Sequence, residues 1–351
     1  MRVLIPDAKF TDAAEIESGV AGRAIAFVPR RHLPQAEIPV EDWETCDGVL
    51  AYDEVRLDKH WLERMPRCRV VVRAGVGFDN VDLDAAGRLG IAVCNVPDYG
   101  TTDVADHAIA MLLTLTRGTA GFDEAMRRDP VAGWKFDGPP LLRRLRGLVF
   151  GVVGLGRIGL ATALRAKAFG MEVMFFDPYR PTGTELSLGF GRADSLAELM
   201  GRADVVSVHT PLTRETHRML DAAAFAASKP GQILVNTARG PVVDLDALHE
   251  ALAGGRLAGA ALDVMPVEPI ARDIDHPLFT AWRNAESWIA GRLLLSPHSA
   301  FYSPDSIRDL RRKSAEVVTA ALRDGRLINC VNRAWLSDAR GWPLEKDGAE
   351  G

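Results

Sequence analysis

The sequence predicts an α/β protein built from two doubly wound domains, each with a parallel sheet that helices cover on both faces. Two observations predict this fold class. Short β-rich apolar runs alternate with amphipathic stretches along the chain, which is typical of βαβ units. The chain also has 351 residues, and because a domain usually holds about 100–200 residues, two domains are expected.

The first series of strands is expected within the first hundred residues. Each apolar run is closely followed by Gly, Pro or Asp, which are residues that end strands. These runs predict a small α/β domain. They are Val3–Ile5, Ala24–Val28, Gly48–Ala51, Val70–Arg73 and Ala92–Asn95.

The pattern changes after residue 100. Thr101 is a residue type that caps helices, and the strongly apolar stretch 104–116 predicts a long, largely buried helix. Residues 118–146 are less regular and contain several prolines and Trp134. We interpret this stretch as an excursion from the domain, in the form of an arm to a partner subunit.

A second βαβ series begins at Leu148, and no internal repeat or low-complexity segment interrupts it. The last part of the chain, from Ser303 to Leu327, has helical spacing. The expected strands and the loops after them lie in 148–156, 172–177, 204–211, 232–240, 259–264 and 293–300.

Composition excludes several classes of protein. Hydrophobic residues make up 47% and charged residues 25% of the chain, with a formal net charge of -5, as in ordinary globular proteins. The basic clusters at 143–146 and 311–313 are interpreted as solvated helix faces, because apolar residues adjoin each at helical spacing. We therefore expect no nucleic-acid partner.

Cysteines and apolar segments bear on metal content and location. The four cysteines lie far apart and form no CxxC pair, so neither a zinc site nor a disulfide framework is predicted, and no metal is expected. The N-terminus lacks the apolar core of a signal peptide, and no uncharged run reaches the roughly 18 residues of a membrane helix. We expect a cytoplasmic protein without a membrane partner.

A glycine-rich turn indicates a dinucleotide site. Gly154, Gly156 and Gly159 follow an apolar run and open a helical stretch. Three glycines at this spacing are a weak signal alone, but between a strand and a helix they indicate a phosphate-binding turn. The backbone and the helix N-terminus would hold a pyrophosphate. The next strand ends at Asp177, whose carboxylate would accept hydrogen bonds from a ribose 2′-hydroxyl and repel a 2′-phosphate, so NAD is favoured over NADP, although Arg180 lies nearby.

Three polar residues are expected at strand ends and suit the reduction of a 2-keto acid. They are Arg239, Glu268 and His298. Ligands bind beyond the carboxyl ends of parallel strands, so the three side chains can converge. Arg239 can hold a carboxylate or carbonyl oxygen, His298 can exchange the proton, and Glu268 can orient and charge the imidazole.

Several segments resemble the D-isomer-specific 2-hydroxyacid dehydrogenases, a family that includes phosphoglycerate, glycerate, D-lactate and phosphite dehydrogenases. Residues 161–179 and 328–336 resemble more closely its C-terminal-binding-protein branch, which consists of NAD(H)-binding transcriptional corepressors. The resemblance covers nearly the whole chain. It is carried by residues 72–82, 90–97, 151–159, 235–244, 259–269 and 296–300.

The resemblance implies roles for individual residues. Arg239, Glu268 and His298 would be the catalytic set, and Val76 and Gly77 would bind the substrate carboxylate through backbone amides. Asp263 would meet the nicotinamide amide, and Phe301 would line the substrate pocket. The remaining implied cofactor contacts are Arg157, Ile158, Asp177, His209, Thr210, Pro211, Thr237, Ala238, Arg239 and His298.

The resemblance also implies a split architecture. Residues 1–100 plus 301–345 would form a flavodoxin-like substrate domain, and residues 101–300 an NAD-binding Rossmann domain. The active site would lie in a cleft between them, and the protein would be a homodimer through the arm at 118–146. The regulatory domain of long phosphoglycerate dehydrogenases is not expected, since no third domain follows residue 345.

The resemblance leaves alternatives open. The first hypothesis is reversible hydride transfer between NAD(H) and a small 2-hydroxy or 2-keto acid. The alternatives are an NAD(H)-sensing, corepressor-like binding protein and a phosphite dehydrogenase on the same scaffold. The stretch 279–295 is longer than the corresponding link in the family, and its Trp282 and Trp288 fit either a surface insertion or a pocket lining.

Overall fold

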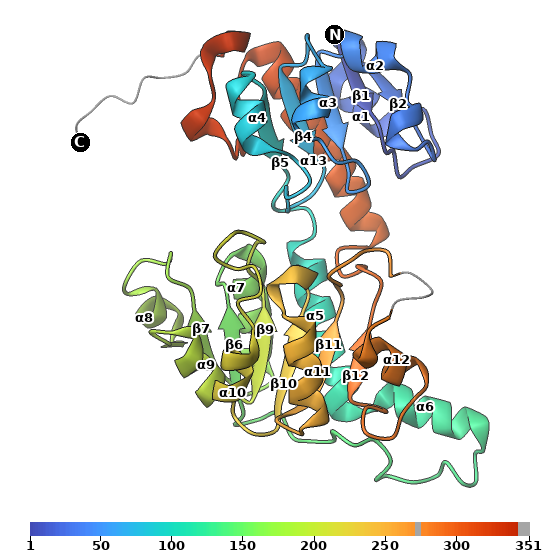
Figure 1. Ribbon diagram of the computed structural model, residues 1–351, viewed down its shortest axis with the longest axis vertical. Helices are drawn as coiled ribbons and strands as arrows, with labels where there is room; N and C mark the ends of the chain where they lie inside the picture. Colours follow the sequence, from blue (N-terminus) through green and yellow to red (C-terminus); the bar gives the residue numbers. More distant parts are fainter. Residues whose placement is uncertain (271–274, 343–351) are drawn as a thin grey trace. The chain divides into compact units, whose positions relative to one another are not determined.

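The structure is a computed structural model that describes residues 1–270 and 275–342 (Figure 1). The chain forms two compact units: Met1–Gly100 together with the segment that begins at Ser303, and Thr101–Tyr302. Each unit is built on one sheet, and all strand pairs in both sheets are parallel. The predicted α/β fold with two parallel-sheet domains is therefore confirmed.

The first unit contains a 5-stranded sheet with the order β2-β1-β3-β4-β5. Side chains of α1 and α13 pack on one face of this sheet, and side chains of α2, α3 and α4 pack on the other. The strands are β1 (Arg2–Ile5), β2 (Ala26–Pro29), β3 (Gly48–Ala51), β4 (Val70–Arg73) and β5 (Ala92–Asn95). The helices are α1 (Glu15–Ala21), α2 (Val40–Thr45), α3 (Lys59–Glu63), α4 (Leu83–Arg88) and α13 (Pro304–Asp324).

The ends of α13 follow from local sequence. The Ser303 hydroxyl accepts a hydrogen bond from the Ser306 N–H at 3.0 Å, and the Ser306 hydroxyl accepts one from the Ser303 N–H at 2.9 Å. Pro304 occupies the first turn, where its missing N–H costs nothing. Gly325 ends the helix with a φ of 66°. The predicted C-terminal helix is confirmed.

Arg311 on α13 corrects the interpretation of residues 311–313 as a solvated helix face. Arg311 is 6% exposed, and its guanidinium donates to both carboxylate oxygens of Glu17 and of Asp12 at 2.7–2.8 Å. The group also lies 3.6 Å from the centre of the Phe10 ring. A buried cation needs such partners, and nothing in the spacing of 311–313 indicates that two carboxylates of the N-terminal region face it.

The second unit contains a 7-stranded sheet with the order β12-β11-β10-β9-β6-β7-β8. Side chains of α5 and α7 pack on one face, and those of α9, α10, α11 and α12 on the other. The strands are β6 (Val149–Val153), β7 (Glu172–Phe176), β8 (Gly191–Arg192), β9 (Val205–Val208), β10 (Gln232–Asn236), β11 (Leu257–Leu262) and β12 (Leu293–Leu295). The helices are α5 (Thr101–Arg117), α6 (Thr119–Arg128), α7 (Arg157–Ala168), α8 (Thr184–Leu188), α9 (Leu196–Arg202), α10 (Ala222–Ala227), α11 (Leu245–Ala253) and α12 (Pro277–Arg283).

The order of the strands creates a switch point in this sheet. From β6 the chain passes to β7 and β8 on one side, and then returns to β9 on the other side of β6. The loops after β6 and β9 therefore leave in opposite directions, and a crevice opens between them at the carboxyl edge. The fold thus places the predicted nucleotide turn at the position where such sheets bind ligands.

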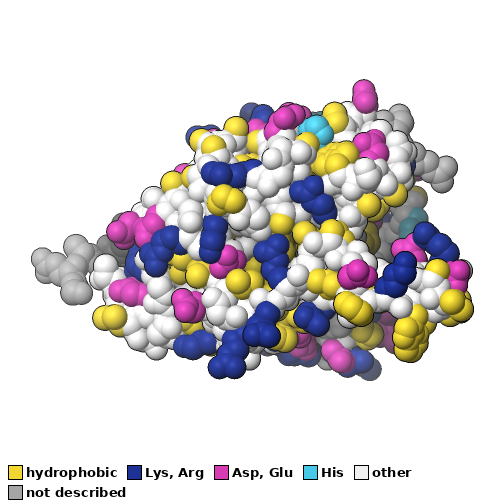
Figure 2. Space-filling view, turned by 90° about the horizontal axis from the view of Figure 1, so that it is seen from below, with side chains coloured by type: hydrophobic (Ala, Val, Ile, Leu, Met, Phe, Trp, Pro, Cys, Tyr) yellow, Lys and Arg dark blue, Asp and Glu magenta, His cyan; other side chains and the backbone are white. Residues whose placement is uncertain are grey.

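The predicted excursion at 118–146 consists of α6 and an irregular segment after it. Three large apolar side chains of this segment are almost fully exposed, namely Val131 at 86%, Trp134 at 80% and Phe136 at 90%. Figure 2 shows hydrophobic side chains at the right-hand end of the lower face, where α6 lies in Figure 1. We call residues 118–146 the arm.

Within residues 1–270 and 275–342, no helix combines the length and the apolar character that crossing a membrane requires.

Candidate active site

The predicted cofactor residues of the second unit gather at one edge of its sheet. Because all the strands are parallel, the loops that follow them leave from the same carboxyl edge. The residues after the strands are Gly154 and Gly156 after β6, Asp177 after β7, His209, Thr210 and Pro211 after β9, Thr237, Ala238 and Arg239 after β10, Asp263 after β11, and His298 after β12.

The three glycines of the turn differ in what they make possible. A Cβ on Gly159 would lie 2.1 Å from the Gly154 carbonyl oxygen, so only glycine lets α7 pack this closely on β6. Gly154 has a φ of 89°, and a Cβ there would lie 2.9 Å from the Thr210 side chain. A Cβ on Gly156 would meet nothing within 4 Å. The space beside Gly156, at the N-terminus of α7, therefore fits the close approach of a pyrophosphate.

Asp177 lies directly beside this turn. Its carboxylate accepts hydrogen bonds from the backbone N–H groups of Leu155 at 2.8 Å and Tyr179 at 2.9 Å. The Arg180 guanidinium lies 3.5 Å from the same carboxylate. The aspartate is thus fixed at the end of β7, next to the first glycine of the turn, which suits a carboxylate that receives a ribose hydroxyl.

Three buried polar atoms near this edge have no hydrogen-bond partner among the described residues. They are His209 Nδ1, Thr210 Oγ1 and Thr237 Oγ1, and all three belong to residues predicted to contact the cofactor. Buried polar groups are nearly always paired in folded proteins, so unpaired ones at a predicted binding edge point to a polar ligand. A dinucleotide supplies hydroxyl, amide and phosphate groups for them.

His209 is held in its neutral form. Burial of its ring lowers the pKa of His209 to about 3, although the residue keeps some exposed surface. The other ring nitrogen, Nε2, lies 2.8 Å from the Ser207 hydroxyl. A permanently neutral imidazole serves as a hydrogen-bonding group and does not exchange protons with a substrate near neutral pH.

Glu268 and His298 form a direct pair. The Glu268 carboxylate accepts a hydrogen bond from His298 Nδ1 at 2.6 Å and another from the Met265 N–H at 2.7 Å. Because an ionised carboxylate only accepts, Nδ1 carries the proton, and Nε2 is the nitrogen that exchanges protons with a ligand. Both side chains keep about a third of their surface exposed (34% and 35%), so a ligand can reach them.

Gly240 brings the loop of Arg239 against the loop that leads to Glu268. A Cβ at Gly240 would lie 2.0 Å from the backbone of Met265, so only glycine permits this approach. The Arg239 guanidinium donates to the Ala238 carbonyl at 2.8 Å, and the Asn236 side chain donates to the Arg239 carbonyl at 3.0 Å. The hydrogen bonds fix the loop of Arg239, and the close approach at Gly240 brings it against the loop of Glu268.

Asp263 organises the segment that carries His298. Its fully buried carboxylate accepts hydrogen bonds from the Ser296 hydroxyl at 2.6 Å and from the N–H groups of Ser299 and Ala300 at 2.9 and 3.0 Å. The Asp263 carbonyl also accepts from the His298 N–H at 2.7 Å. This residue therefore positions His298, and its predicted contact with the nicotinamide amide stays a prediction.

Two residues of this network, His107 and Ser296, were not predicted as site residues from the sequence. His107 on α5 has its Nε2 3.1 Å from the Ser296 hydroxyl and 3.6 Å from the Asp263 carboxylate. For His107, the only sign in the sequence was a histidine next to Asp106 in the mostly apolar run 104–116. Phe301 was predicted, and its ring meets the His298 ring edge-on at 6.0 Å.

The predicted carboxylate-binding residues Val76 and Gly77 belong to the first unit. They follow β4, and the Asn95 side chain fixes this loop by donating to the Val76 carbonyl at 2.7 Å. The Arg73 guanidinium folds back onto the same loop and donates to the Ala74 carbonyl at 2.6 Å. This contact holds the Arg73 side chain against the loop that carries Val76 and Gly77.

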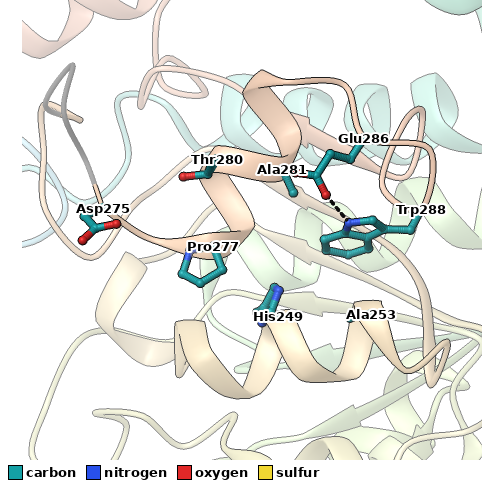
Figure 3. Close-up of a pocket in the computed structure, with 8 residues that line it drawn as sticks. All are labelled: His249, Ala253, Asp275, Pro277, Thr280, Ala281, Glu286 and Trp288. Atoms are coloured by element: carbon teal, nitrogen blue, oxygen red, sulfur yellow. Dashed lines mark hydrogen bonds between the residues drawn. The ribbon is translucent and has the colours of Figure 1, made fainter.

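The insertion at 279–295 contributes to a cavity of about 630 Å³ between α11 and α12, shown in Figure 3. The Trp288 ring meets the His249 ring edge-on at 5.6 Å, and its indole N–H donates to Glu286 at 2.9 Å. The Trp288 carbonyl accepts from Arg292, which also reaches the Leu257 carbonyl at the start of β11. Trp288 thus lies toward the amino edge of the sheet, and this position argues against a role in lining the substrate pocket.

Comparison with known proteins identifies the family. The family model described as "D-isomer specific 2-hydroxyacid dehydrogenase, NAD binding domain" matches residues 109–300. The D-3-phosphoglycerate dehydrogenase of Mycobacterium tuberculosis is 41% identical over 287 residues, which are 82% of this chain and 51% of that protein. The chain therefore spans about half the length of this curated relative.

Solved structures agree in fold over almost the whole chain. The TT0316 protein of Thermus thermophilus is 36% identical, with a TM-score of 0.76 that covers 94% of this chain and 100% of the other. The D-lactate dehydrogenase of Aquifex aeolicus, complexed with NAD and lactic acid, is 28% identical, with a TM-score of 0.79 over 92% and 96% of the two chains. The chain belongs to the D-isomer-specific 2-hydroxyacid dehydrogenase family, and its second unit holds that family's NAD-binding domain.

Proposed function

We propose that this chain is an NAD-dependent D-2-hydroxyacid dehydrogenase that transfers a hydride reversibly between NAD(H) and a small 2-keto acid. The observation that carries the proposal is the 2.6 Å hydrogen bond between Glu268 and His298 at the carboxyl edge of the nucleotide unit. The buried, unpartnered atoms of His209, Thr210 and Thr237 belong to the loops after neighbouring strands and suit a bound dinucleotide.

The residues divide the chemistry among them. The nicotinamide ring of the bound cofactor supplies or accepts the hydride. In the reductive direction, His298 Nε2 donates a proton to the ketone oxygen while Glu268 stabilises the charged imidazolium through Nδ1. In the oxidative direction, the same nitrogen removes the hydroxyl proton. Asp263 and Ser296 keep the imidazole in place without touching the reacting atoms.

Arg239 is the proposed substrate anchor. Its planar guanidinium matches a carboxylate or an adjacent carbonyl oxygen. Phe301, which packs beside His298, favours a substrate with an apolar side chain. The roles of Val76 and Gly77 in binding the carboxylate remain predictions that rest on the family resemblance.

The substrate class draws support from relatives. A D-3-phosphoglycerate dehydrogenase and a D-lactate dehydrogenase are both similar to this chain, and both names denote enzymes of 2-hydroxy acids. The chain corresponds to about half of the former protein, so its exact substrate needs a direct search. Glyoxylate, hydroxypyruvate, larger apolar 2-keto acids and 3-phosphohydroxypyruvate form the panel, read by loss of NADH absorbance.

The decisive experiment compares His298→Gln with the unchanged chain on the best substrate of this panel. We expect kcat to fall by about 10²–10⁴, because an acid/base group typically contributes that much, while the Kd for NADH from fluorescence titration stays within about threefold. His249→Gln, a histidine in the amino-edge cavity, is the matched control and should leave kcat unchanged. An unchanged kcat in His298→Gln excludes the assignment.

The alternatives give different results in the same assays. An NAD(H)-sensing binding protein would bind NADH tightly yet reduce no 2-keto acid at any pH between about 5 and 9, the range in which an imidazole changes its protonation. A phosphite dehydrogenase would reduce NAD with phosphite and leave the keto acids untouched.

We also propose that the chain forms a homodimer through the arm. Val131, Trp134 and Phe136 expose nearly all of their apolar surface, and large exposed apolar patches on a soluble protein mark contact surfaces. A second copy of the same arm is the partner that the family resemblance implies.

A further inference from the structure

We propose that Cys94 and Cys330 form an oxidisable dithiol, a modification site that a hydroperoxide converts reversibly into a disulfide within the first unit. The two residues are separated by more than two hundred positions in the sequence, so their spacing gives no sign of a pair. The fold brings them together, because the segment after α13 runs back along β5.

The backbone places the two cysteines directly opposite each other. They form an antiparallel bridge outside the named strands. The flanking hydrogen bonds run from the Asn95 N–H to the Asn329 carbonyl at 3.2 Å and from the Val331 N–H to the Val93 carbonyl at 2.8 Å. Cys94 and Cys330 are therefore a non-hydrogen-bonded pair, the kind in which opposite Cα atoms lie only about 4.5 Å apart.

This separation matches a disulfide. Cystine bridges span Cα distances of about 4.4–6.8 Å, so the bond needs little backbone movement. The bridge would join β5 covalently to the segment after α13, and the hydrogen bonds on either side already hold the two backbones in register. Both cysteines are reduced in the structure.

The two sulfur atoms differ in exposure and in pKa, so we expect Cys330 to react with the hydroperoxide first. Cys94 is fully buried, whereas Cys330 is partly exposed. The neighbouring Cys94 thiol lowers the pKa of Cys330, while burial and the Cys330 sulfur raise the pKa of Cys94, so Cys330 is the sulfur that ionises more readily. In the structure the Cys330 thiol donates to Asn332 Oδ1 at 3.4 Å. The thiolate is the reactive form of cysteine, and here it is also the form that solvent reaches.

The oxidation takes two steps. The Cys330 thiolate attacks one oxygen of the hydroperoxide, the O–O bond breaks, and Cys330 sulfenic acid and hydroxide form. The Cys94 sulfur then attacks the sulfenic sulfur, hydroxide leaves, and the thiol proton joins the released hydroxide to give water. The hydroxide from the first step takes up the proton that Cys330 released when it ionised, so two thiols lose two electrons in total and one hydrogen peroxide becomes two water molecules. A dithiol reductant reverses the change by exchange.

The other two cysteines provide an internal control. Cys46 and Cys68 are both fully buried, and their thiols donate to the Trp43 and Val70 carbonyls at 3.2 and 3.4 Å. The neighbouring Cys46 thiol and burial raise the pKa of Cys68, so no thiolate forms there. This pair should stay reduced under conditions that oxidise Cys94 and Cys330.

The test uses the reduced full-length chain treated with a small excess of hydrogen peroxide and then alkylated in denaturant. We expect the number of titratable thiols to fall from four to two, mass spectrometry to find a Cys94–Cys330 cross-linked peptide, and dithiothreitol to restore all four. Cys94→Ser should leave Cys330 as a sulfenic acid that dimedone traps. Cys68→Ser should form the cross-link as the unchanged chain does.

Three results would overturn the proposal. They are the persistence of four thiols, a cross-link that includes Cys46 or Cys68, and oxidation of Cys330 to a sulfinic acid without a disulfide. The unchanged chain alone distinguishes these outcomes, so the test does not depend on the folding of any variant, nor on whether the chain is a dehydrogenase.

Discussion

At the scale of single residues, His298 has a strained backbone conformation that hydrogen bonds to Asp263 hold in place. Its φ of 51° lies in the left-handed region, which is uncommon for residues other than glycine, although histidine adopts it more often than most. Such strain costs on the order of 1 kcal/mol or more and persists only where neighbours enforce it. Asp263 enforces it through its carbonyl bond to the His298 N–H and its carboxylate bonds to Ser299 and Ala300. The strained turn aims the imidazole at Glu268.

His209 leads to a prediction about pH and stability. Its pKa is about 3 in the folded chain against 6.5 for an ordinary imidazole, so between these values the unfolded chain binds a proton that the folded chain does not. Stability from this group is therefore complete above about pH 7 and falls as the pH drops, by about 1.4 kcal/mol at pH 5.5. His209→Gln should lack this loss.

The measurement compares the free energy of unfolding of the two chains at pH 8 and pH 5.5, from hydrogen exchange of the β9 and β10 peptides in urea. Other titrating groups contribute equally to both chains, and the difference between the two pH slopes isolates His209. Identical slopes would show that folding does not lower the pKa of His209, and would contradict the prediction.

Residues expected to act on a ligand were easier to predict from sequence than residues that only hold other residues in place. Glu268 and His298 stand at strand ends with chemistry of their own, and the structure pairs them. His107 and Ser296 support Asp263 through a contact between α5 and the loop after β12, and no local pattern reports a contact across the fold. Arg311 was misjudged for the same reason, because its carboxylate partners are nearly three hundred positions away.

At the scale of elements, the periodicity of apolar residues predicted the strands well. The first five strands of the structure match the predicted runs closely, and the match is exact for β3, β4 and β5, because strands buried on both faces of a parallel sheet are continuous apolar runs. The edge strand β2 has no buried residue, and its predicted run begins two residues too early. The short edge strand β8 was not predicted. It has two residues, Gly191 and Arg192, and too few side chains to show a pattern.

The arm gives a prediction about assembly. The double substitution Trp134→Ser with Phe136→Ser should convert a dimer into the 38.1 kDa monomer in light scattering, because exposed aromatic side chains dominate such contacts. The dimer should weaken by at least about a hundredfold, which corresponds to roughly 2.7 kcal/mol.

Leu186→Ser is the matched control for the arm. Leu186 is 82% exposed but lies on α8, outside the arm, so its loss should leave the assembly unchanged. If the unchanged chain is a monomer at micromolar concentration, or if the arm variant remains dimeric, the arm is not the interface.

At the scale of the whole molecule, the second unit has two ends with different chemistry. Its carboxyl edge carries the glycine turn, the unpartnered polar atoms and the Glu268–His298 pair. Near its amino edge lies the cavity of His249 and Trp288, and Trp288 belongs to the stretch that the sequence left open as a surface insertion or a pocket lining. The sequence does not predict at which edge of the sheet Trp288 lies, because its position depends on the turn after α12.

This difference between the two edges predicts which amides bound NADH protects from hydrogen exchange. NADH at about a hundred times its Kd should slow hydrogen exchange by about a hundredfold in the loops after β6, β9 and β10. This holds for amides that exchange by local opening, because opening there requires release of the ligand. Amides of α11 and α12 that open locally should exchange at an unchanged rate. Trp288→Phe should likewise leave kcat and KM within twofold. Protection of α11 and α12 by NADH, or a large change of KM in Trp288→Phe, would move the cofactor or substrate to the amino edge and contradict the arrangement argued from the strand order.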